Sequence, residues 1–135
     1  MSSNLVQPSV FLRRVLWADA GVSAVVGAVM AAGAGPLQRL TGLPPGLLVS
    51  AGLALFPYAA YLVWIASRRA VPRAAVWVPI VANVLWAIDC AWVGLSGRFD
   101  LHGLGEIFLV MHVVTVLVFA ELEFIGLTRA SRLAA

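Results

Sequence analysis

Four long apolar stretches, separated by short segments rich in polar residues, proline and glycine, dominate the hydropathy pattern of this 135-residue chain. They cover Val15–Gly35, Leu47–Ala66, Val76–Leu95 and Ile107–Leu127, and each contains 20 or 21 residues. At a rise of about 1.5 Å per residue, a helix of that length crosses the roughly 30 Å hydrocarbon core of a bilayer. The pattern predicts an all-α fold: one domain over residues 1–135, with four transmembrane helices bundled so that neighbours run antiparallel.

The composition places the chain in a lipid bilayer. A hydrophobic fraction of 62% and a mean hydropathy of +0.99 leave too little polar surface for an ordinary soluble domain. The net charge is +3, but all nine basic residues are arginines scattered at the ends of the stretches, which does not form the basic stripe of a nucleic-acid-binding protein. The absence of lysine indicates a GC-rich bacterial genome. Nucleic acid is therefore not an expected partner.

The arginines predict the orientation of the chain. Basic residues in short loops accumulate on the cytoplasmic side of a membrane. Seven of the nine lie on one side of the predicted bundle, so we expect both termini in the cytoplasm and the protein in the bacterial inner membrane. Asp19 lies early in the first stretch and three more stretches follow, so we interpret that stretch as a helix and not a cleaved twin-arginine leader. The seven are Arg13, Arg14, Arg68, Arg69, Arg73, Arg129 and Arg132; Arg39 and Arg98 lie on the other side.

Small residues recur at every fourth position of the first stretch, in two adjacent rows. Small side chains let membrane helices approach closely and gain van der Waals contact. Two interpretations are open: both rows pack inside the bundle, or one row is the interface of a homo-oligomer or of a complex with another membrane protein. The first row is Ala20, Ala24, Ala28 and Ala32, and the second is Ser23, Gly27, Ala31 and Gly35.

Ionisable residues within the predicted spans form two levels. Asp19 and Glu123 each lie about 6 Å inside the cytoplasmic boundary, and the two carboxylates are candidates to share one proton. Asp89 and His112 lie roughly 8 Å inside the opposite boundary, and we expect the carboxylate to orient the imidazole by a hydrogen bond. Such residues are costly in a membrane, so they mark either functional groups or structural pairs that lock helices together.

Helical periodicity refines these positions. His112 and Glu123 fall on one stripe of the last stretch and are predicted to face the interior of the bundle. Asn83 is a polar residue between the two levels, which are separated by roughly 14 Å of helix. Glu121 points away from that stripe and is predicted to pair near the headgroups with Arg13, Arg14 or Arg68.

The run Leu16-Trp17-Ala18-Asp19, early in the first of four spans, resembles helix one of the small multidrug resistance exporters. The resemblance covers one helix, and the family carboxylate is a glutamate that lies deeper. In that family the carboxylate binds protons and cations alternately within a dimer, which implies such a role for Asp19. Over its whole length, the chain is also similar to small uncharacterised four-helix inner-membrane proteins of proteobacteria.

Three functions compete. The first is a structural or accessory role through helix–helix contacts, in a homo-oligomer or a larger membrane complex. The second is proton-coupled transport through Asp19, Asp89, His112 and Glu123. The third is binding of haem, quinone or lipid, with His112 as the polar anchor. We expect no enzymatic activity, since no serine or cysteine is placed as a nucleophile beside His112, and we expect neither a bound metal nor a resident cofactor.

Overall fold

The computed structural model describes residues 4–134, and most of them are helical. Four of the five helices are long and apolar enough to span a membrane, so the predicted all-α fold with four membrane-length helices is confirmed. The fifth, α2, is an eight-residue helix between the first two long ones. The elements are β1 (Leu5–Val6), α1 (Val10–Ala32), α2 (Ala34–Thr41), α3 (Pro45–Ser67), β2 (Val71–Pro72), α4 (Arg73–Leu95) and α5 (Gly103–Ala134).

The first predicted span is displaced toward the N-terminus. α1 begins at Val10 because the Ser9 hydroxyl caps it, accepting a hydrogen bond from the Leu12 N–H at 3.1 Å. It ends at Ala32, and the N–H of Gly33 closes the last turn on the Val29 carbonyl. Gly35, predicted to end the first helix, instead belongs to α2. The other three predicted spans lie within α3, α4 and α5, which are all longer than predicted.

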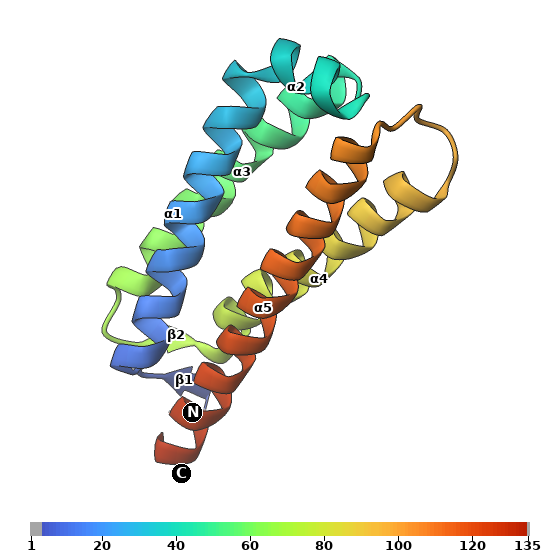
Figure 1. Cartoon of the computed structure of the whole chain (residues 1–135). Helices are drawn as coiled ribbons and strands as arrows, with labels where there is room; N and C mark the ends of the chain where they lie inside the picture. Colours follow the sequence, from blue (N-terminus) through green and yellow to red (C-terminus); the bar gives the residue numbers. More distant parts are fainter. Residues whose placement is uncertain (1–3, 135) are drawn as a thin grey trace.

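The helices are arranged as two pairs. α1 packs mainly against α3, and α4 packs mainly against α5 (Figure 1). The two pairs meet at the end of the molecule that carries β1, β2 and both termini, which we call the strand end. The opposite end carries α2 and residues 96–102, and we call it the α2 end.

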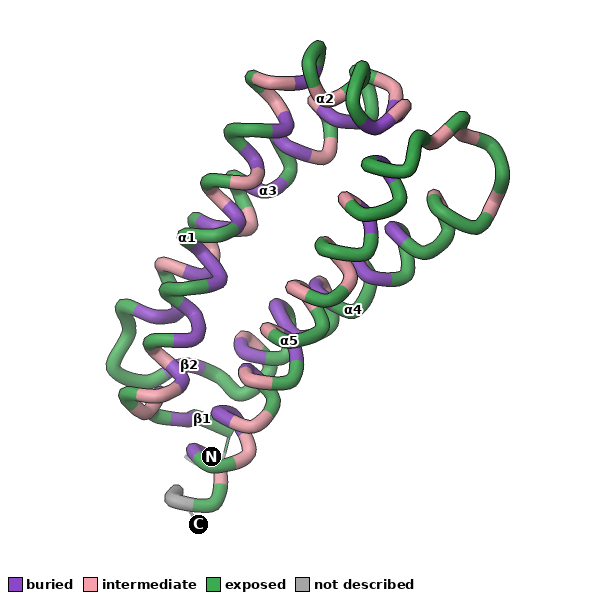
Figure 2. The backbone as a smooth tube through the Cα atoms, in the orientation of Figure 1, coloured by how far each residue is buried: buried purple, intermediate pink, exposed green. Residues whose placement is uncertain are grey.

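The strand end holds the four long helices together with a continuous apolar core. β1 and β2 pair antiparallel, with Val6 opposite Val71, and both of these side chains are buried. The Arg13 guanidinium donates hydrogen bonds to the carbonyls of Ala66 and Arg68 at 2.9 Å, which ties α1 to the end of α3. Toward the α2 end, α5 becomes mostly exposed along its length (Figure 2).

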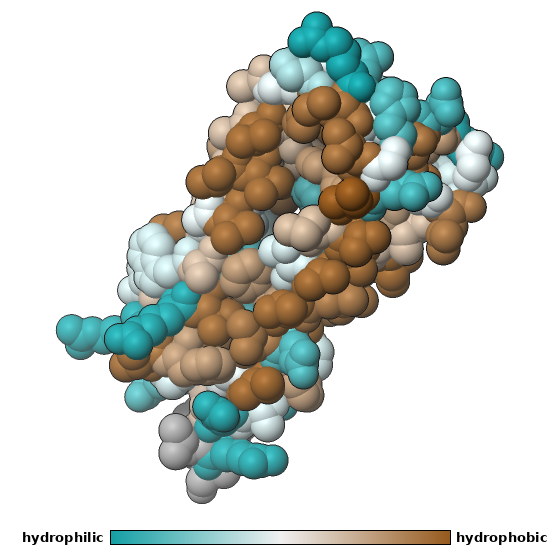
Figure 3. Space-filling view, in the orientation of Figure 1, coloured by the Kyte–Doolittle hydropathy of each residue, from teal (hydrophilic) through white to brown (hydrophobic). Residues whose placement is uncertain are grey.

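The outer surface suits lipid. Apolar side chains form a broad band around the middle of the visible face, with hydrophilic residues toward both ends (Figure 3). Trp17 and Trp64 are about half exposed, and the Arg68 guanidinium lies over the Trp64 ring at 5.2 Å. Tryptophan and arginine near helix ends are typical of the boundary between hydrocarbon and headgroups.

One of the two small-residue rows of α1 packs within the chain. Gly27 crosses α3 at Gly52, and a Cβ atom placed on Gly27 would lie 2.7 Å from the Gly52 carbonyl oxygen. The backbones therefore touch because neither position has a side chain. In the other row Ala20 is buried and Ala24 half-buried, whereas the row becomes exposed further along α1. The exposed members of that row are Ala28 and Ala32. In the row that contains Gly27, Ala31 is half-buried and Gly35 is exposed on α2.

Candidate functional site

Five polar side chains from all four long helices meet inside the bundle. This polar cluster includes two carboxyl groups that are almost completely buried: Asp19 on α1 is 2% exposed and Glu123 on α5 is 0% exposed. The predicted interior position of Glu123 is confirmed, and so is its proximity to Asp19 through a shared partner. The members of the polar cluster are Asp19, Ser23, Tyr58, Asn83 and Glu123.

Asp19 accepts hydrogen bonds from three side chains. The Tyr58 hydroxyl donates to Oδ2 at 2.8 Å, the Asn83 amide donates to the same oxygen at 3.1 Å, and the Ser23 hydroxyl donates to Oδ1 at 3.2 Å. Donors of this kind replace the water that a carboxylate loses on burial. Asp19 is therefore held in a site suited to a negative charge.

Glu123 has a much poorer set of partners. Asn83 bridges the two carboxyl groups, because its amide nitrogen also donates to Glu123 Oε1 at 3.0 Å. Glu123 Oε2 is buried and has no hydrogen-bond partner among the described residues. No arginine reaches either carboxyl group within the described part of the chain, since the Arg13 guanidinium is committed to backbone carbonyls. The two carboxyl groups thus occupy unequal environments.

Tyr58 is a member of the polar cluster that was not predicted from the sequence. It lies in the middle of α3, in an otherwise apolar segment directly after Pro57. A tyrosine hydroxyl at that depth needs a polar partner, which is a signal that the sequence does contain. The identity of the partner depends on the rotation of α3 against α1, which hydropathy does not reveal.

At the second polar level, the predicted partner of His112 is wrong. Asp89 is exposed, and no hydrogen bond or ion pair joins it to His112 in the structure. Instead, the Trp86 indole N–H donates to His112 Nδ1 at 3.2 Å, and the two rings are stacked with an interplanar angle of 22°. The helical rotation explains the difference: Trp86 lies on the face of α4 that contacts α5, and Asp89 projects outside that contact.

The geometry of His112 argues against haem ligation. An indole N–H only donates, so Nδ1 uses its lone pair to accept, and the neutral imidazole carries its hydrogen on Nε2. Ligation of an iron atom through Nε2 would therefore require this hydrogen to leave Nε2. No three side chains of histidine, cysteine, aspartate or glutamate are grouped to hold a metal ion within residues 4–134.

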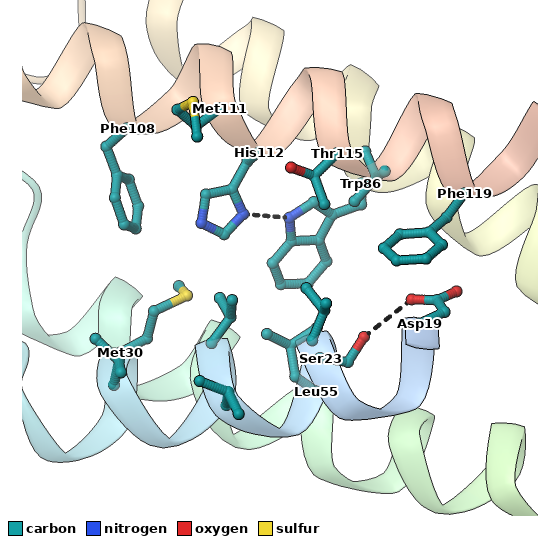
Figure 4. Close-up of a pocket in the computed structure, with 15 residues that line it drawn as sticks. Asp19, Ser23, Met30, Leu55, Trp86, Phe108, Met111, His112, Thr115 and Phe119 are labelled. Carbon is teal, nitrogen blue, oxygen red and sulfur yellow. Dashed lines mark hydrogen bonds between the residues drawn. The ribbon is translucent and has the colours of Figure 1, made fainter. Parts of the chain in front are cut away.

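A cavity of about 390 Å³ lies between α1 and α5 and connects the two polar levels. Its walls are largely apolar. The His112 ring lies on one side, and Asp19 of the polar cluster lies at one end (Figure 4). A second cavity of about 270 Å³ lies on the other side of the Trp86–His112 pair and is lined by Asp89 and Cys90. His112 thus lines both cavities.

The two helix pairs also touch at the α2 end. The Thr41 carbonyl at the end of α2 accepts a hydrogen bond from the His102 N–H at 3.0 Å, just before α5 begins. Gly105 lies against the same Thr41 backbone, where a side chain would collide with it. The helix pairs are therefore joined at the α2 end, at the strand end and through the polar cluster.

Glu121 does not form the predicted ion pair. It is exposed, and no arginine lies within ion-pair distance of it in the described structure. Arg13 instead bonds to the backbone, and Arg68 covers the Trp64 ring. Glu121 consequently has no part in the candidate site.

The site therefore combines an apolar cavity with a polar cluster at one end and an imidazole on its wall. Comparisons of the chain with models of protein families, with curated proteins and with solved structures found no match.

Proposed function

We propose that this protein is a multi-pass membrane protein that binds a small, membrane-soluble molecule in the cavity between α1 and α5. The observation that carries the proposal is an apolar cavity of about 390 Å³ with one half-buried imidazole on its wall. Ligand sites are typically apolar cavities of a few hundred Å³ with few polar groups that fix orientation. Because the cavity lies between membrane-length helices, its ligand would enter from the hydrocarbon phase.

The proposed topology has antiparallel neighbouring helices and both termini in the cytoplasm of a bacterium, with the strand end on that side of the inner membrane. Both termini lie at one end of the molecule (Figure 1). Seven of the nine arginines lie on elements that meet there, in agreement with the positive-inside rule. A cysteine-accessibility assay on residues added at each terminus would test this orientation.

The ligand proposal is tested by filling the cavity. Thr115 on α5 lines the cavity, so Thr115→Trp should occupy the space and exclude a ligand. The neighbouring Val114 is 55% exposed, so Val114→Trp adds the same side chain toward lipid and serves as the control. Each protein would be extracted from its own membranes in mild detergent and analysed by native mass spectrometry and by solvent extraction of bound molecules.

We expect one apolar molecule to be retained by the native protein and by Val114→Trp, and to be lost from Thr115→Trp. If the native protein retains none, or if Thr115→Trp retains as much as the control, the cavity is not a ligand site.

The polar cluster favours a second candidate function, proton binding as part of proton-coupled transport. Asp19 accepts three hydrogen bonds, whereas Glu123 accepts one, and its Oε2 has no partner within residues 4–134. Two negative charges buried without a cation would cost several kcal/mol, so we place one proton on Glu123. A cavity of about 200 Å³ also touches Tyr58 and Asn83, so the cluster adjoins open space on two sides.

Infrared spectroscopy distinguishes the two carboxyl groups. A protonated carboxylic acid has a carbonyl stretch that should disappear in Glu123→Gln and persist in Asp19→Asn. Proton flux into liposomes that is abolished by Asp19→Asn would support transport, whereas flux equal to that of empty liposomes would contradict it.

An accessory role through helix–helix contacts has less support. Gly27 already packs against α3 within the chain, so one small-residue row is not free for a partner. The exposed Ala28 and Ala32 remain on the surface of α1. Cross-linking between Ala28→Cys copies in native membranes would reveal a homo-oligomer that uses this face.

A further inference from the structure

The Trp86–His112 hydrogen bond determines which chemical group a ligand must offer. Because the indole N–H can only donate, His112 Nδ1 is an acceptor, and the ring hydrogen is on Nε2. In Figure 4 the second ring nitrogen points into the cavity, away from Trp86. Nε2 has no hydrogen-bond partner among residues 4–134, so the cavity wall presents one unused hydrogen-bond donor.

The rest of the cavity selects against a charged ligand. Its walls are mainly valine, leucine, methionine and phenylalanine side chains, which offer no compensation to an ion removed from water. Asp19, at the end of the cavity, is already satisfied by three donors and does not require a cationic partner. The ligand that fits is therefore neutral, apolar over most of its surface, and equipped with an acceptor oxygen.

The depth of His112 separates a carbonyl compound from a phospholipid. His112 lies about 8 Å along the helix from the midpoint of the 30-residue span Gly103–Arg132, which is inside the roughly 30 Å hydrocarbon core when that span is centred in the bilayer. Phospholipid ester oxygens stay near the headgroups, so they do not reach this level while the headgroup remains hydrated. A carbonyl compound that dissolves in the hydrocarbon core does reach it.

Aromatic side chains beside His112 favour a flat ligand. The Phe108 ring centroid is 4.5 Å from that of His112, and Phe119 lines the same cavity. Planar rings gain offset-stacked or edge-to-face contacts with such side chains. Resting on the proposed ligand-binding function, we infer that the cavity binds a neutral carbonyl-bearing ring of the quinone type, with its oxygen accepting a hydrogen bond from His112 Nε2–H.

A pair of matched probes tests this inference. Duroquinone and durene share the same tetramethylated six-membered ring, but only duroquinone has carbonyl oxygens. Binding of each to the protein in phosphatidylcholine nanodiscs would be measured by equilibrium dialysis, with empty nanodiscs as the correction for partition into lipid. We expect the native protein to bind duroquinone about fivefold to tenfold more tightly than durene, the ratio that one hydrogen bond in an apolar site supports.

The variants show whether this preference depends on His112. His112→Phe removes the donor and should bring the two dissociation constants to within about twofold. Trp86→Phe frees Nδ1 to take the hydrogen in part of the molecules, so it should reduce the preference by a smaller amount. Trp77→Phe changes a tryptophan of α4 that contacts Phe124 and should keep the preference. If both probes bind equally to the native protein, the ligand-binding proposal stands and the inference about ligand class is wrong. If neither probe binds above empty nanodiscs, both are overturned.

Discussion

α1 contacts α3 through one face and α5 through another, and the two contacts are built differently. Against α3, Gly27 and Gly52 bring the backbones together so closely that an added Cβ would lie within 3 Å of the opposing carbonyl. Against α5, α1 presents branched side chains such as Val22 and Val26, and a cavity of about 390 Å³ separates the helices. On that side, the polar cluster links the helix pairs by hydrogen bonds.

The difference reflects how helices associate in lipid. A surrounding hydrocarbon phase removes the hydrophobic incentive, so association depends on van der Waals contact and interhelical hydrogen bonds. The α1–α3 contact depends on van der Waals contact between backbones. The link from α1 to α4 and α5 depends on interhelical hydrogen bonds. A contact made by a few hydrogen bonds at one level leaves room elsewhere for a ligand, whereas a contact between backbones does not.

Removing the amide that bridges the carboxyl groups should have the largest effect. Asn83→Leu keeps the size of the side chain but deletes hydrogen bonds to both Asp19 and Glu123. We expect the free energy of unfolding to fall by about 3 kcal/mol, since two buried acceptors lose a donor. Unfolding by titration with denaturing detergent, followed by circular dichroism, would measure it. The exposed neighbour Val84→Leu is the control, and equal values for the two variants would show that the polar cluster adds no stability.

Adding one methyl group at the α1–α3 crossing should have the next largest effect. Gly27→Ala places a Cβ 2.7 Å from the Gly52 carbonyl oxygen, so one backbone must move. We expect a loss of about 2 kcal/mol from overpacking, measured by the same titration. Gly21→Ala on the same helix meets nothing within 4 Å and should be neutral or slightly stabilising. If Gly27→Ala leaves the free energy of unfolding unchanged, the backbones of α1 and α3 are not in contact.

Removing the tyrosine hydroxyl should have a smaller effect. Tyr58→Phe deletes one of the three donors to Asp19 and leaves the other two in place. We expect a loss of about 1 kcal/mol, in the range of single hydrogen bonds between membrane helices. A double-mutant cycle with Asp19→Leu, which removes the acceptor oxygens, would isolate the pair, and a coupling energy of zero would contradict the hydrogen bond.

The smallest effect is expected at the second carboxyl group. Glu123→Gln mimics a neutral carboxylic acid and keeps an oxygen that accepts from Asn83. If Glu123 holds a proton as proposed, the free energy of unfolding should change by less than about 0.5 kcal/mol. A loss of several kcal/mol in the same titration would show instead that Glu123 is a required anion.

The sequence predicts the depth of the polar residues in the membrane better than it predicts their hydrogen-bond partners. Asp19, Glu123 and Asn83 were identified because polar residues within apolar stretches are rare, and their positions along each helix set their level. His112 faces the interior as predicted, but Asp89 is not its partner, although both lie at one level on consecutive helices. The depth of a residue in the membrane follows from counting residues along its helix. Its hydrogen-bond partner depends on how each helix is rotated about its axis.

Hydropathy and residue counting by themselves determined that this protein has four membrane-length helices and which polar groups lie within them. The lengths follow from the rise of a helix and the thickness of a bilayer, so no tertiary contact is needed to predict them. Only the tertiary structure decided that Tyr58 reaches Asp19, that Trp86 holds His112, and that a cavity opens between α1 and α5. These features depend on the rotation and separation of helices, which are set by side chains of several helices packing together at once.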